Sequence, residues 1–414
     1  MLEITLNMYQ TAGVAMLLFV LGRFLTNRID FLKRCCIPAP VVGGLIFALT
    51  HLGLYMAGII QFSFDENVKN FFMTLFFTSV GYTACFRLLK KGGKKVFTFL
   101  LVSIVMVILQ NVLSSGLAVI FNWDPRLGLC TGSIPMVGGH GTSGSYGPEL
   151  EKLGISGANV LAIASATFGL VAGSLMGGPT ARGIINRYNL NSNENMDDLM
   201  EMDNESAAEK EKAERVDLDS FTNAAILLIV ASGLGTLLTT AFNNIKINVG
   251  GYDVSFTFPT YIGAMVVAAV IRNFCDMKHI VMPSKAMDLW GNVSLSIFLA
   301  IALMVLKLWE LVSLAGPMIV MLAAQVVLMF VFARFVVFNV MGRDYEAAVM
   351  TSAFCGFGMG ATPNAMANMQ VLTKRYGPAP QAYFIVPLVG SLFIDFCNGI
   401  IITLFLNILP VIFH

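Results

Sequence analysis

The stretch at residues 138–147 constrains the fold of this chain most strongly, because half of its residues are glycine and it lies between two long apolar runs. Glycine at this density breaks a helix and leaves backbone N–H and C=O groups without helical partners. In a bilayer such groups must be buried in protein or line a polar cavity. A second glycine-rich stretch, residues 356–364, repeats the pattern near the other end of the chain. Two interrupted apolar segments, one in each half, are typical of a transport site.

Composition places the chain in a membrane. Of its 414 residues, 56% are hydrophobic and 12% are charged, whereas a soluble domain carries about 25% charged residues. We therefore expect an all-α, multi-pass protein of the bacterial inner (plasma) membrane, in contact with the lipid bilayer. The net charge of +1 and the lack of a basic stripe outside the loops exclude nucleic-acid binding. The seven cysteines show no zinc-like spacing, so we expect no cofactor.

Apolar runs near the length of about 20 residues that a membrane helix needs recur along the chain. In the first half they are residues 8–25, 41–60, 71–89, 96–121 and 158–185. In the second half they are residues 221–242, 258–274, 290–308, 317–338 and 383–409. The glycine-rich segments at about 127–147 and 347–369 are too interrupted for straight spans, and we interpret each as a re-entrant hairpin. The first residues lack the basic region of a cleaved signal peptide, so we expect the first span to be retained.

The order of these segments predicts an inverted repeat. Residues 1–185 form an N-terminal repeat of five spans, residues 186–219 a charged cytoplasmic linker, and residues 220–414 a C-terminal repeat of five spans. Because each half has an odd number of spans, the halves enter the membrane in opposite senses. Asp124 and Asp344 precede the two hairpins at similar distances.

The distribution of basic residues supports this topology through the positive-inside rule. With both termini outside and both hairpins re-entrant, the cytoplasmic loops receive every Lys and Arg except Lys69, Arg126, Lys152, Lys246 and Lys307. If either hairpin were a full span, every later loop would change sides and the asymmetry would shrink. The first hairpin is therefore expected on the outer side and the second on the inner side.

The hairpins carry the candidate site. Helix N-termini at a hairpin tip offer free N–H groups and partial positive charge to a carboxylate, and unwound carbonyls with hydroxyls suit sodium. The candidate substrate-binding residues are Gly139, His140, Gly141, Thr142, Ser143, Gly358, Gly360, Ala361, Thr362 and Asn364. The candidate sodium ligands are Asp395, Asn398, Thr142 and Thr362. The alternative is that the glycines only allow two helices to pack tightly.

Several polar residues inside apolar runs remain open to more than one interpretation. A carboxylate such as Asp395 is costly in a span unless it is paired or solvated, so it ligates sodium, carries a proton or serves as a hydrogen-bonded structural acid. Likewise, His140 is a substrate donor, a proton site or a structural donor. The remaining candidates either line a cavity or bridge helices, and they are Gln110, Asn111 and Gln325.

Two glycine patterns need separate interpretation. Gly139, Gly141 and Gly144 match the GxGxxG pattern of dinucleotide-binding proteins, but that pattern has meaning only between a strand and a helix. Here membrane-length runs flank it, so we interpret the match as a coincidence. The doubled GxxxG pattern at residues 169–177 favours close helix packing.

The chain resembles the bacterial glutamate:sodium symporter family nearly from end to end. In the first half the resemblance lies in Gly138-Gly139-His140-Gly141-Thr142, Ala166-Thr167-Phe168-Gly169-Leu170-Val171 and Gly177-Gly178-Pro179. In the second half it lies in Gly291-Asn292-Val293-Ser294-Leu295-Ser296, Leu306-Lys307-Leu308-Trp309-Glu310-Leu311, Cys355-Gly356-Phe357-Gly358-Met359-Gly360-Ala361-Thr362-Pro363, Ala367-Asn368-Met369-Gln370 and Phe393-Ile394-Asp395. The resemblance implies ten spans, two re-entrant loops from opposite sides and both termini outside. It also implies sodium-coupled uptake of L-glutamate, with sodium as the coupling ion, by an elevator-like motion in a homodimer.

Other functions fit the same pattern less closely. One is a proton- or sodium-coupled carrier of another small carboxylate, such as citrate or malate. Another, from a different class, is an anion channel. An enzyme is not expected, because the sequence shows neither a nucleophile–base pair nor a metal cluster.

Overall fold

The computed structural model is built almost entirely from helices and describes residues 2–34, 37–86, 93–191, 216–244, 246–249, 252–255, 259–311 and 314–413. Nine of the described helices are long and apolar enough to cross a membrane, as judged by length and composition. The third expected span is also helical, as α4 (Asn67–Thr83), although at 17 residues it is shorter than these nine. The expectation of a helical membrane protein is therefore confirmed.

The first half of the chain contains long helices on either side of an interrupted segment. Its helices are α1 (Met8–Arg28), α2 (Asp30–Arg34), α3 (Ala39–Met56), α4, α6 (Gly93–Ile120), α7 (Pro125–Gly128), η1 (Leu129–Thr131), α8 (Ser133–Met136), α9 (Gly139–Lys152) and α10 (Ala158–Tyr188). The strands β1 (Leu2–Leu6) and β2 (Ile60–Phe64) pair in parallel, with Leu2 opposite Ile60.

The second half follows a similar order. Its helices are α12 (Leu218–Asn243), α13 (Thr260–Met277), α14 (Ser284–Met304), η2 (Leu308–Leu311), α15 (Ala315–Phe332), the π-helical turn η3 (Ala333–Val337), α16 (Phe338–Met341), α17 (Tyr345–Gly358), α18 (Thr362–Tyr376), α19 (Pro380–Leu392) and α20 (Ile394–Ile412). The strands β3 (Lys246–Val249) and β4 (Tyr252–Ser255) form an antiparallel pair.

Local sequence signals explain where several helices begin. At the start of α1, the Asn7 side chain accepts a hydrogen bond from the Gln10 N–H and the Gln10 side chain accepts one from the Asn7 N–H, each at 3.0 Å. This reciprocal capping box satisfies two N–H groups that a helix leaves free. At the start of α3 a proline occupies the first turn, where its missing N–H costs nothing.

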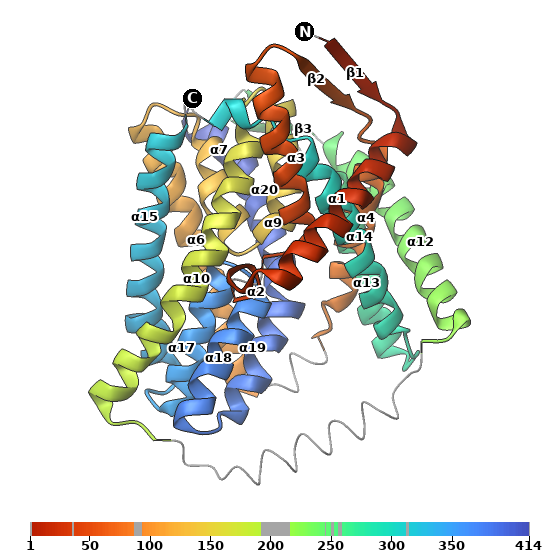
Figure 1. Cartoon of the computed structure of the whole chain (residues 1–414). Helices are drawn as coiled ribbons and strands as arrows, with labels where there is room; N and C mark the ends of the chain where they lie inside the picture. The colour runs from red at the N-terminus through yellow and green to blue at the C-terminus, as the bar shows by residue number, and fades with distance from the viewer. Residues whose placement is uncertain are drawn as a thin grey trace.

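The long helices separate into two bodies that lie side by side in Figure 1. The flanking body comprises α1, α3, α4, α12, α13 and α14, within residues 8–83 and 218–304. The core body comprises α6 to α10 and α15 to α20, within residues 93–188 and 315–412. The chain passes between the bodies after α4, after α10 and after α14, so each body contains helices from both halves of the chain.

The two bodies meet along α9 and along α20. The Phe298 ring of α14 lies against Gly144, and the rings of Tyr146 and Tyr261 meet edge to face with centroids 5.5 Å apart. Where α20 faces α12 and α13, an apolar cavity of about 240 Å³ lies between the bodies, lined by residues that include Val266 and Leu404. The packing between the bodies is thus sparser than the packing within each.

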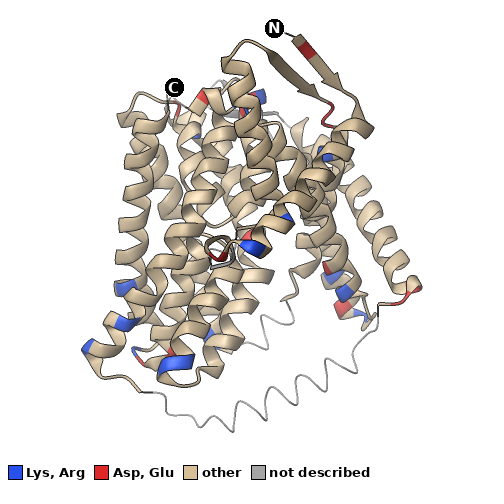
Figure 2. Cartoon of the chain, in the orientation of Figure 1, with Lys and Arg blue, Asp and Glu red and all other residues tan. Residues whose placement is uncertain are grey.

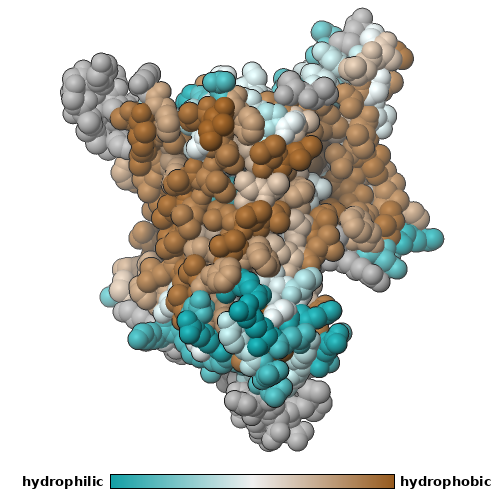
Figure 3. All heavy atoms as spheres, turned by 90° about the vertical axis from the view of Figure 1, so that its left-hand side faces the viewer, coloured by the Kyte–Doolittle hydropathy of each residue, from teal (hydrophilic) through white to brown (hydrophobic). Residues whose placement is uncertain are grey.

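The surface has the polarity of a membrane protein. Figure 3 shows an apolar belt at mid-height, with hydrophilic residues gathered mainly toward the lower end. Both termini lie at the same end of the bundle, and the Lys and Arg residues drawn in Figure 2 gather mainly at the opposite end. A belt of this kind suits insertion in a bilayer.

The structure corrects two of the expected spans. The run at 383–409 is not one continuous helix, because α19 ends at Leu392 and α20 begins at Ile394. The third run is interrupted after Thr83, where α4 ends, and its last residues, 87–89, lie outside the described residues. Most of the expected linker, residues 192–215, lies outside the described residues, as does the cysteine pair at 35 and 36.

Candidate functional site

Each glycine-rich segment forms two helical arms joined at a tip. In the first hairpin, residues 125–152, the tip lies between α8 and α9. In the second hairpin, residues 345–376, it lies between α17 and α18. Figure 1 shows α17 and α18 side by side toward the lower end of the molecule, and α7 and α9 toward the upper end. The hairpins are a few residues longer than the expected segments at 127–147 and 347–369.

An aspartate begins each hairpin. The Asp124 carboxylate caps α7 by accepting a hydrogen bond from the Arg126 N–H at 2.8 Å. The Asp344 carboxylate caps α17 by accepting one from the Ala347 N–H at 2.7 Å. Both side chains satisfy N–H groups that the first helical turn leaves free. The two aspartates therefore perform the same local task.

The two hairpin tips touch. Gly139, the first residue of α9, has a left-handed φ of +57°, and a Cβ built on it would lie 3.1 Å from the Gly360 carbonyl oxygen. A side chain here would be strained by the backbone and crowded by the opposite tip. The contact joins segments that lie more than 200 residues apart in sequence.

Three helix N-termini are brought near these tips. Within the described residues, α9, α18 and α20 begin without a side-chain cap. Thr362, at the start of α18, donates a hydrogen bond at 2.8 Å to the Gly390 carbonyl, just before the break between α19 and α20. Uncapped N-termini leave N–H groups available and concentrate partial positive charge. The arrangement suits an anion with more than one carboxylate.

The first tip is fixed against α10 and α6. His140 is buried, and its Nε2 lies 3.0 Å from the Thr167 hydroxyl of α10. The Asn111 side chain of α6 accepts a hydrogen bond from the Ser133 N–H at 2.9 Å. Thr142 is buried in α9, and so is Ser143. Asn111 thus bridges a helix to the first hairpin, which is one of the two expected interpretations.

The second tip is held by side chains from three helices. The Gln110 amide donates at 2.8 Å to the Gly358 carbonyl, and the Gln325 amide donates at 2.9 Å to the Gln110 carbonyl. Asn364 of α18 donates at 2.9 Å to the Leu170 carbonyl of α10. Gln110 therefore bridges α6 to the second tip, and Gln325 bridges α15 to α6.

The glycine stripe of α10 provides the close packing that the doubled GxxxG pattern predicts. A Cβ on Gly169 would meet the Met359 carbonyl, and one on Gly173 would lie 2.9 Å from the Cys355 carbonyl. Alanine at either position would push the second hairpin away from α10. The tip position is therefore set by these glycines as well as by hydrogen bonds.

Asp395 lies in the first turn of α20, beside the helix break that the sequence analysis missed. No hydrogen bond or ion pair to its carboxylate exists among the described residues, and the Asp395 residue is neither fully buried nor fully exposed. One turn later, Asn398 donates at 3.2 Å to the Ser133 carbonyl of the first hairpin. A carboxylate without a partner among the described residues is available to a cation.

Buried oxygen atoms without partners gather around the same helices. Within the described residues, six such atoms are the side-chain oxygens of Gln110, Ser133, Ser143, Gln325, Asn364 and Asn398. A buried oxygen without a hydrogen-bond donor is destabilising unless water or a cation satisfies it. Carbonyl, amide and hydroxyl oxygens are the ligands that sodium-like hard cations take. These oxygen atoms therefore suit the coordination of sodium, contact with water around a bound substrate, or both.

Two contributors to the site could not be singled out from their sequence pattern alone. Thr167 partners His140, but a threonine in a long apolar helix usually bonds to its own helix, as Thr167 also does with the Ile163 carbonyl. The residues at the helix break before Asp395 are apolar, so nothing at the break itself distinguishes it from a continuous membrane helix. Its only local signals are Pro387 and Gly390, upstream in α19.

Comparison with known proteins gives a consistent result. A family model described as sodium/glutamate symporter matches residues 4–378. The sodium/glutamate symporter of Haemophilus influenzae is 37% identical over 400 residues, which cover 95% of this chain and 96% of that protein. The sodium/glutamate symporter of Escherichia coli strain K12 is 38% identical over 413 residues, 98% of each chain. Among solved structures, a sodium proton antiporter of Methanocaldococcus jannaschii aligns over 97% of this chain and 98% of its own, with 14% identity and a TM-score of 0.39.

Proposed function

This chain belongs to the sodium/glutamate symporter family, and we propose that it is a secondary active transporter that takes up L-glutamate together with sodium. The observation that carries the proposal is similarity to two proteins of that name over nearly their whole lengths. Because both relatives are named for glutamate, we propose glutamate rather than citrate or malate. For the same reason we propose a symporter rather than an anion channel.

We place the substrate at the hairpin tips. The N-termini of α9 and α18 supply N–H groups to the carboxylates of glutamate. The residues that contribute are Gly139, His140, Gly141, Thr142, Ser143, Gly358, Gly360, Ala361, Thr362 and Asn364. The contact between Gly139 and Gly360 supports one shared site rather than two.

We place sodium near the start of α20. Asp395 supplies a carboxylate, and Asn398 supplies an oxygen that lacks a partner among the described residues. Hydroxyls of Thr142 and Thr362 complete the proposed ligand set. Sodium binding first would neutralise the Asp395 charge, after which the helix N-termini would accept the two carboxylates of the substrate.

The division into two bodies supports an elevator-like mechanism. Every proposed substrate and sodium residue belongs to the core body, so a shift of this body past the flanking body would carry the whole site across the membrane. The sparse packing between the bodies leaves such a shift less costly than unfolding either body. The flanking body would remain fixed in the membrane.

We propose that the two halves are inverted repeats, 1–185 and 220–414 joined by 186–219, with both termini outside and the hairpins re-entrant from opposite sides. The hairpins lie toward opposite ends of the molecule, and the basic residues gather away from the termini. Asn122→Cys, near the termini, and Lys278→Cys, at the opposite end, test this on a cysteine-free background. A membrane-impermeant maleimide applied to whole cells should label only Asn122→Cys.

We further propose a homodimer in the bacterial inner membrane. The outward face of α12 is apolar and exposed, with Ile226, Ile229 and Leu237 among its residues, and a second copy or lipid would cover it. Native mass spectrometry of protein extracted from that membrane should give twice the mass of one chain. A single-chain mass under conditions that keep transport activity would contradict the dimer.

Transport in proteoliposomes tests the central proposal. Purified protein is reconstituted, and uptake of labelled L-glutamate is measured with an inward sodium gradient, with choline in place of sodium, and with unlabelled citrate or malate added. We expect saturable uptake that requires the gradient, counterflow, and inward sodium flux induced by glutamate. Uptake that ignores sodium would contradict the coupling, and conductance without counterflow would favour a channel.

A further inference from the structure

The chain enters the core body from the flanking body at two short crossovers, each of which follows the third long helix of its half. The α4–α6 crossover begins after Thr83, and the α14–α15 crossover begins after Met304. At both places, residues of the crossover are bound to another helix of the flanking body. These are residues 84–86 in the first crossover and Trp309 in the second, where η2 also packs against α10 of the core body. The chemistry of the binding differs, but its placement is equivalent.

Asn273 of α13 holds the start of the α4–α6 crossover. Its amide nitrogen donates at 2.7 Å to the Ala84 carbonyl, and its amide oxygen accepts from the Phe86 N–H at 2.9 Å. This side chain therefore faces the backbone of residues 84–86. One side chain thus pairs with an acceptor and a donor two residues apart, as a neighbouring strand would. The same nitrogen also donates to Ala269 at 2.8 Å, which fixes the amide on its own helix.

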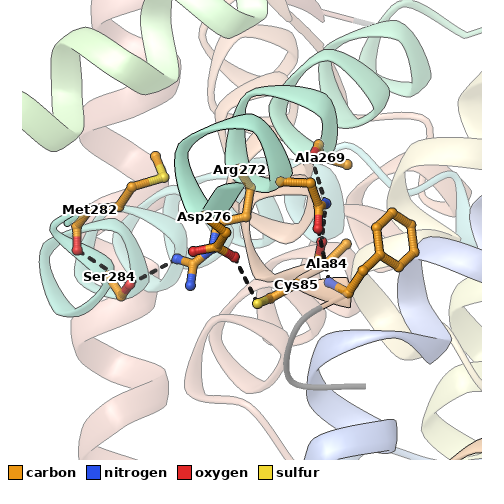
Figure 4. A network of polar contacts seen from close by, with 9 residues as sticks. Ala84, Cys85, Ala269, Arg272, Asp276, Met282 and Ser284 are labelled. Atoms are coloured by element: carbon orange, nitrogen blue, oxygen red, sulfur yellow. Dashed lines mark hydrogen bonds and ion pairs between the residues drawn. The ribbon is translucent and has the colours of Figure 1, made fainter. Parts of the chain in front are cut away.

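The residue between these two backbone contacts is bound to α13 as well. The Cys85 thiol lies 2.8 Å from the Asp276 carboxylate, which also accepts from Arg272 at 3.1 Å. Arg272 in turn donates at 3.1 Å to the Ser284 hydroxyl at the start of α14 (Figure 4). Three consecutive residues of the crossover are therefore tied to one helix, and that helix is braced against the next.

Aromatic rings hold the α14–α15 crossover. The Trp309 ring of η2 stacks on Tyr55 of α3, with centroids 3.9 Å apart and planes 11° apart. The Trp309 ring also meets the His51 ring edge to face, with centroids 5.4 Å apart. His51 is buried and accepts a hydrogen bond at 3.2 Å from the Phe62 N–H of β2. A stacked aromatic pair with an edge contact is stabilising beyond the area that it buries.

The two attachments occupy corresponding places in the two halves. α13 is the second long helix of the second half, and it holds the crossover of the first half. α3 is the second long helix of the first half, and it holds the crossover of the second half. Both attachments lie near the C-terminal ends of these helices, toward opposite ends of the molecule. Hydrogen bonds in one half and aromatic stacking in the other serve corresponding places, which indicates that both halves require a fixed crossover.

We propose that Asn273 and the Tyr55–Trp309 pair are positioning residues for transport, which hold the chain on the flanking body at Phe86 and at Trp309. The inference rests on the proposed movement of the core body. With the chain fixed at these two points, the core body moves relative to constant positions on the flanking body, one toward each end of the molecule. A released crossover would absorb part of the displacement, and the core would reach its end positions less often.

Loss of either attachment should lower the rate of transport without changing the affinity for glutamate. The proposed substrate and sodium residues lie in the core body, away from both attachments. Removing an attachment therefore leaves the binding site intact. Asn273→Ala and Trp309→Leu should therefore keep the glutamate Kd, measured by titration calorimetry in sodium, within about twofold. The maximal uptake rate should fall by about tenfold, as expected for the loss of one or two hydrogen bonds or one stacked pair.

Matched controls remove equivalent contacts away from the crossovers. Trp290→Leu removes a stack on Phe221, with centroids 4.9 Å apart, and an indole hydrogen bond to the Phe221 carbonyl at 3.2 Å, both inside the flanking body. Asn339→Ala removes an exposed amide that bonds only within its own segment of the core body. Asn273→Ser is a second variant, because it loses both amide contacts to the crossover but keeps a small hydroxyl that can bond to its own helix in place of the Ala269 contact. It replaces Asn273→Ala if that variant does not fold.

The outcomes distinguish the proposals. The inference predicts unchanged Kd with a reduced rate for both crossover variants, a multiplied loss in the double variant, and normal rates for the controls. Unchanged rates in folded crossover variants would overturn it. So would a parallel fall in melting temperature, affinity and rate, or an equal loss of rate in Trp290→Leu. Absence of sodium-dependent uptake by the wild-type protein would instead count against the proposed function.

Discussion

Gly139 and Gly360 face each other across the meeting point of the two hairpins, with 3.1 Å between a Cβ built on Gly139 and the Gly360 carbonyl oxygen. Gly139 adopts a left-handed backbone that favours glycine. The contact makes the tip of one hairpin part of the environment of the other. Substitutions at one tip are therefore expected to alter a site that both tips share.

Gly139→Ala should reduce glutamate uptake by about tenfold or more, because the left-handed conformation costs a residue with a Cβ about 1–2 kcal/mol and the methyl group would crowd Gly360. Initial uptake rates in proteoliposomes provide the measurement. Gly154→Ala is the matched control, since Gly154 lies just after α9 with a φ of +87° and has no neighbouring atom within 4 Å. Equal losses in both variants would assign the effect to backbone strain alone.

Asp395→Asn should abolish most sodium-dependent uptake, because the variant lacks the proposed charged sodium ligand. Loss of a contact to a charged group corresponds to about 1.5–3 kcal/mol, or roughly 10–150-fold in sodium affinity. Uptake measured against sodium concentration checks this. Asp219→Asn is a close control, since Asp219 is likewise the second residue of a long helix but is exposed. Wild-type sodium dependence in Asp395→Asn would rule out the proposed role.

Gln110→Leu should destabilise the protein by about 1 kcal/mol, because the Gly358 carbonyl would lose its donor in a buried site. The melting temperature in detergent should fall accordingly. The exposed Gln370→Leu offers a comparison with the same change of side chain. A melting temperature unaffected by Gln110→Leu would show that water replaces the amide at the tip.

The cap at the start of the first hairpin should depend on pH. Burial opposes ionisation of Asp124, but its hydrogen bonds and ion pair with Arg126 outweigh burial, so the pKa of the carboxyl lies below its usual value. Such a group stabilises the fold above its unfolded pKa, and the contribution is lost as the pH falls through the folded pKa. Asp124→Asn should therefore lower the melting temperature at pH 7 and narrow the difference toward about pH 3. A difference independent of pH would refute the assignment.

The length of the apolar runs and the density of glycine were enough to anticipate the helices and both interruptions. The apolar runs correspond to long helices, and the aspartates before the interruptions are helix caps. The break at Phe393 was missed because its neighbours are apolar, and the early end of α4 was missed because Asn273, distant in sequence, binds residues 84 and 86. Likewise, the hydrogen bond from the Gln325 amide to the Gln110 backbone carbonyl joins two helices that are distant in sequence. Tertiary contacts, which no local pattern records, decided each case.

The three passages of the chain between the bodies bear on how such a protein could have originated. Since each body takes helices from both halves, a polypeptide of half this length would complete neither body by itself. Under the opposite orientation that we propose for the halves, two such polypeptides would complete both. Gene duplication followed by fusion would then have preserved an existing pair of chains rather than created a new architecture. Separately encoded halves, cut within 186–219 and produced together, should accordingly reassemble into an active protein.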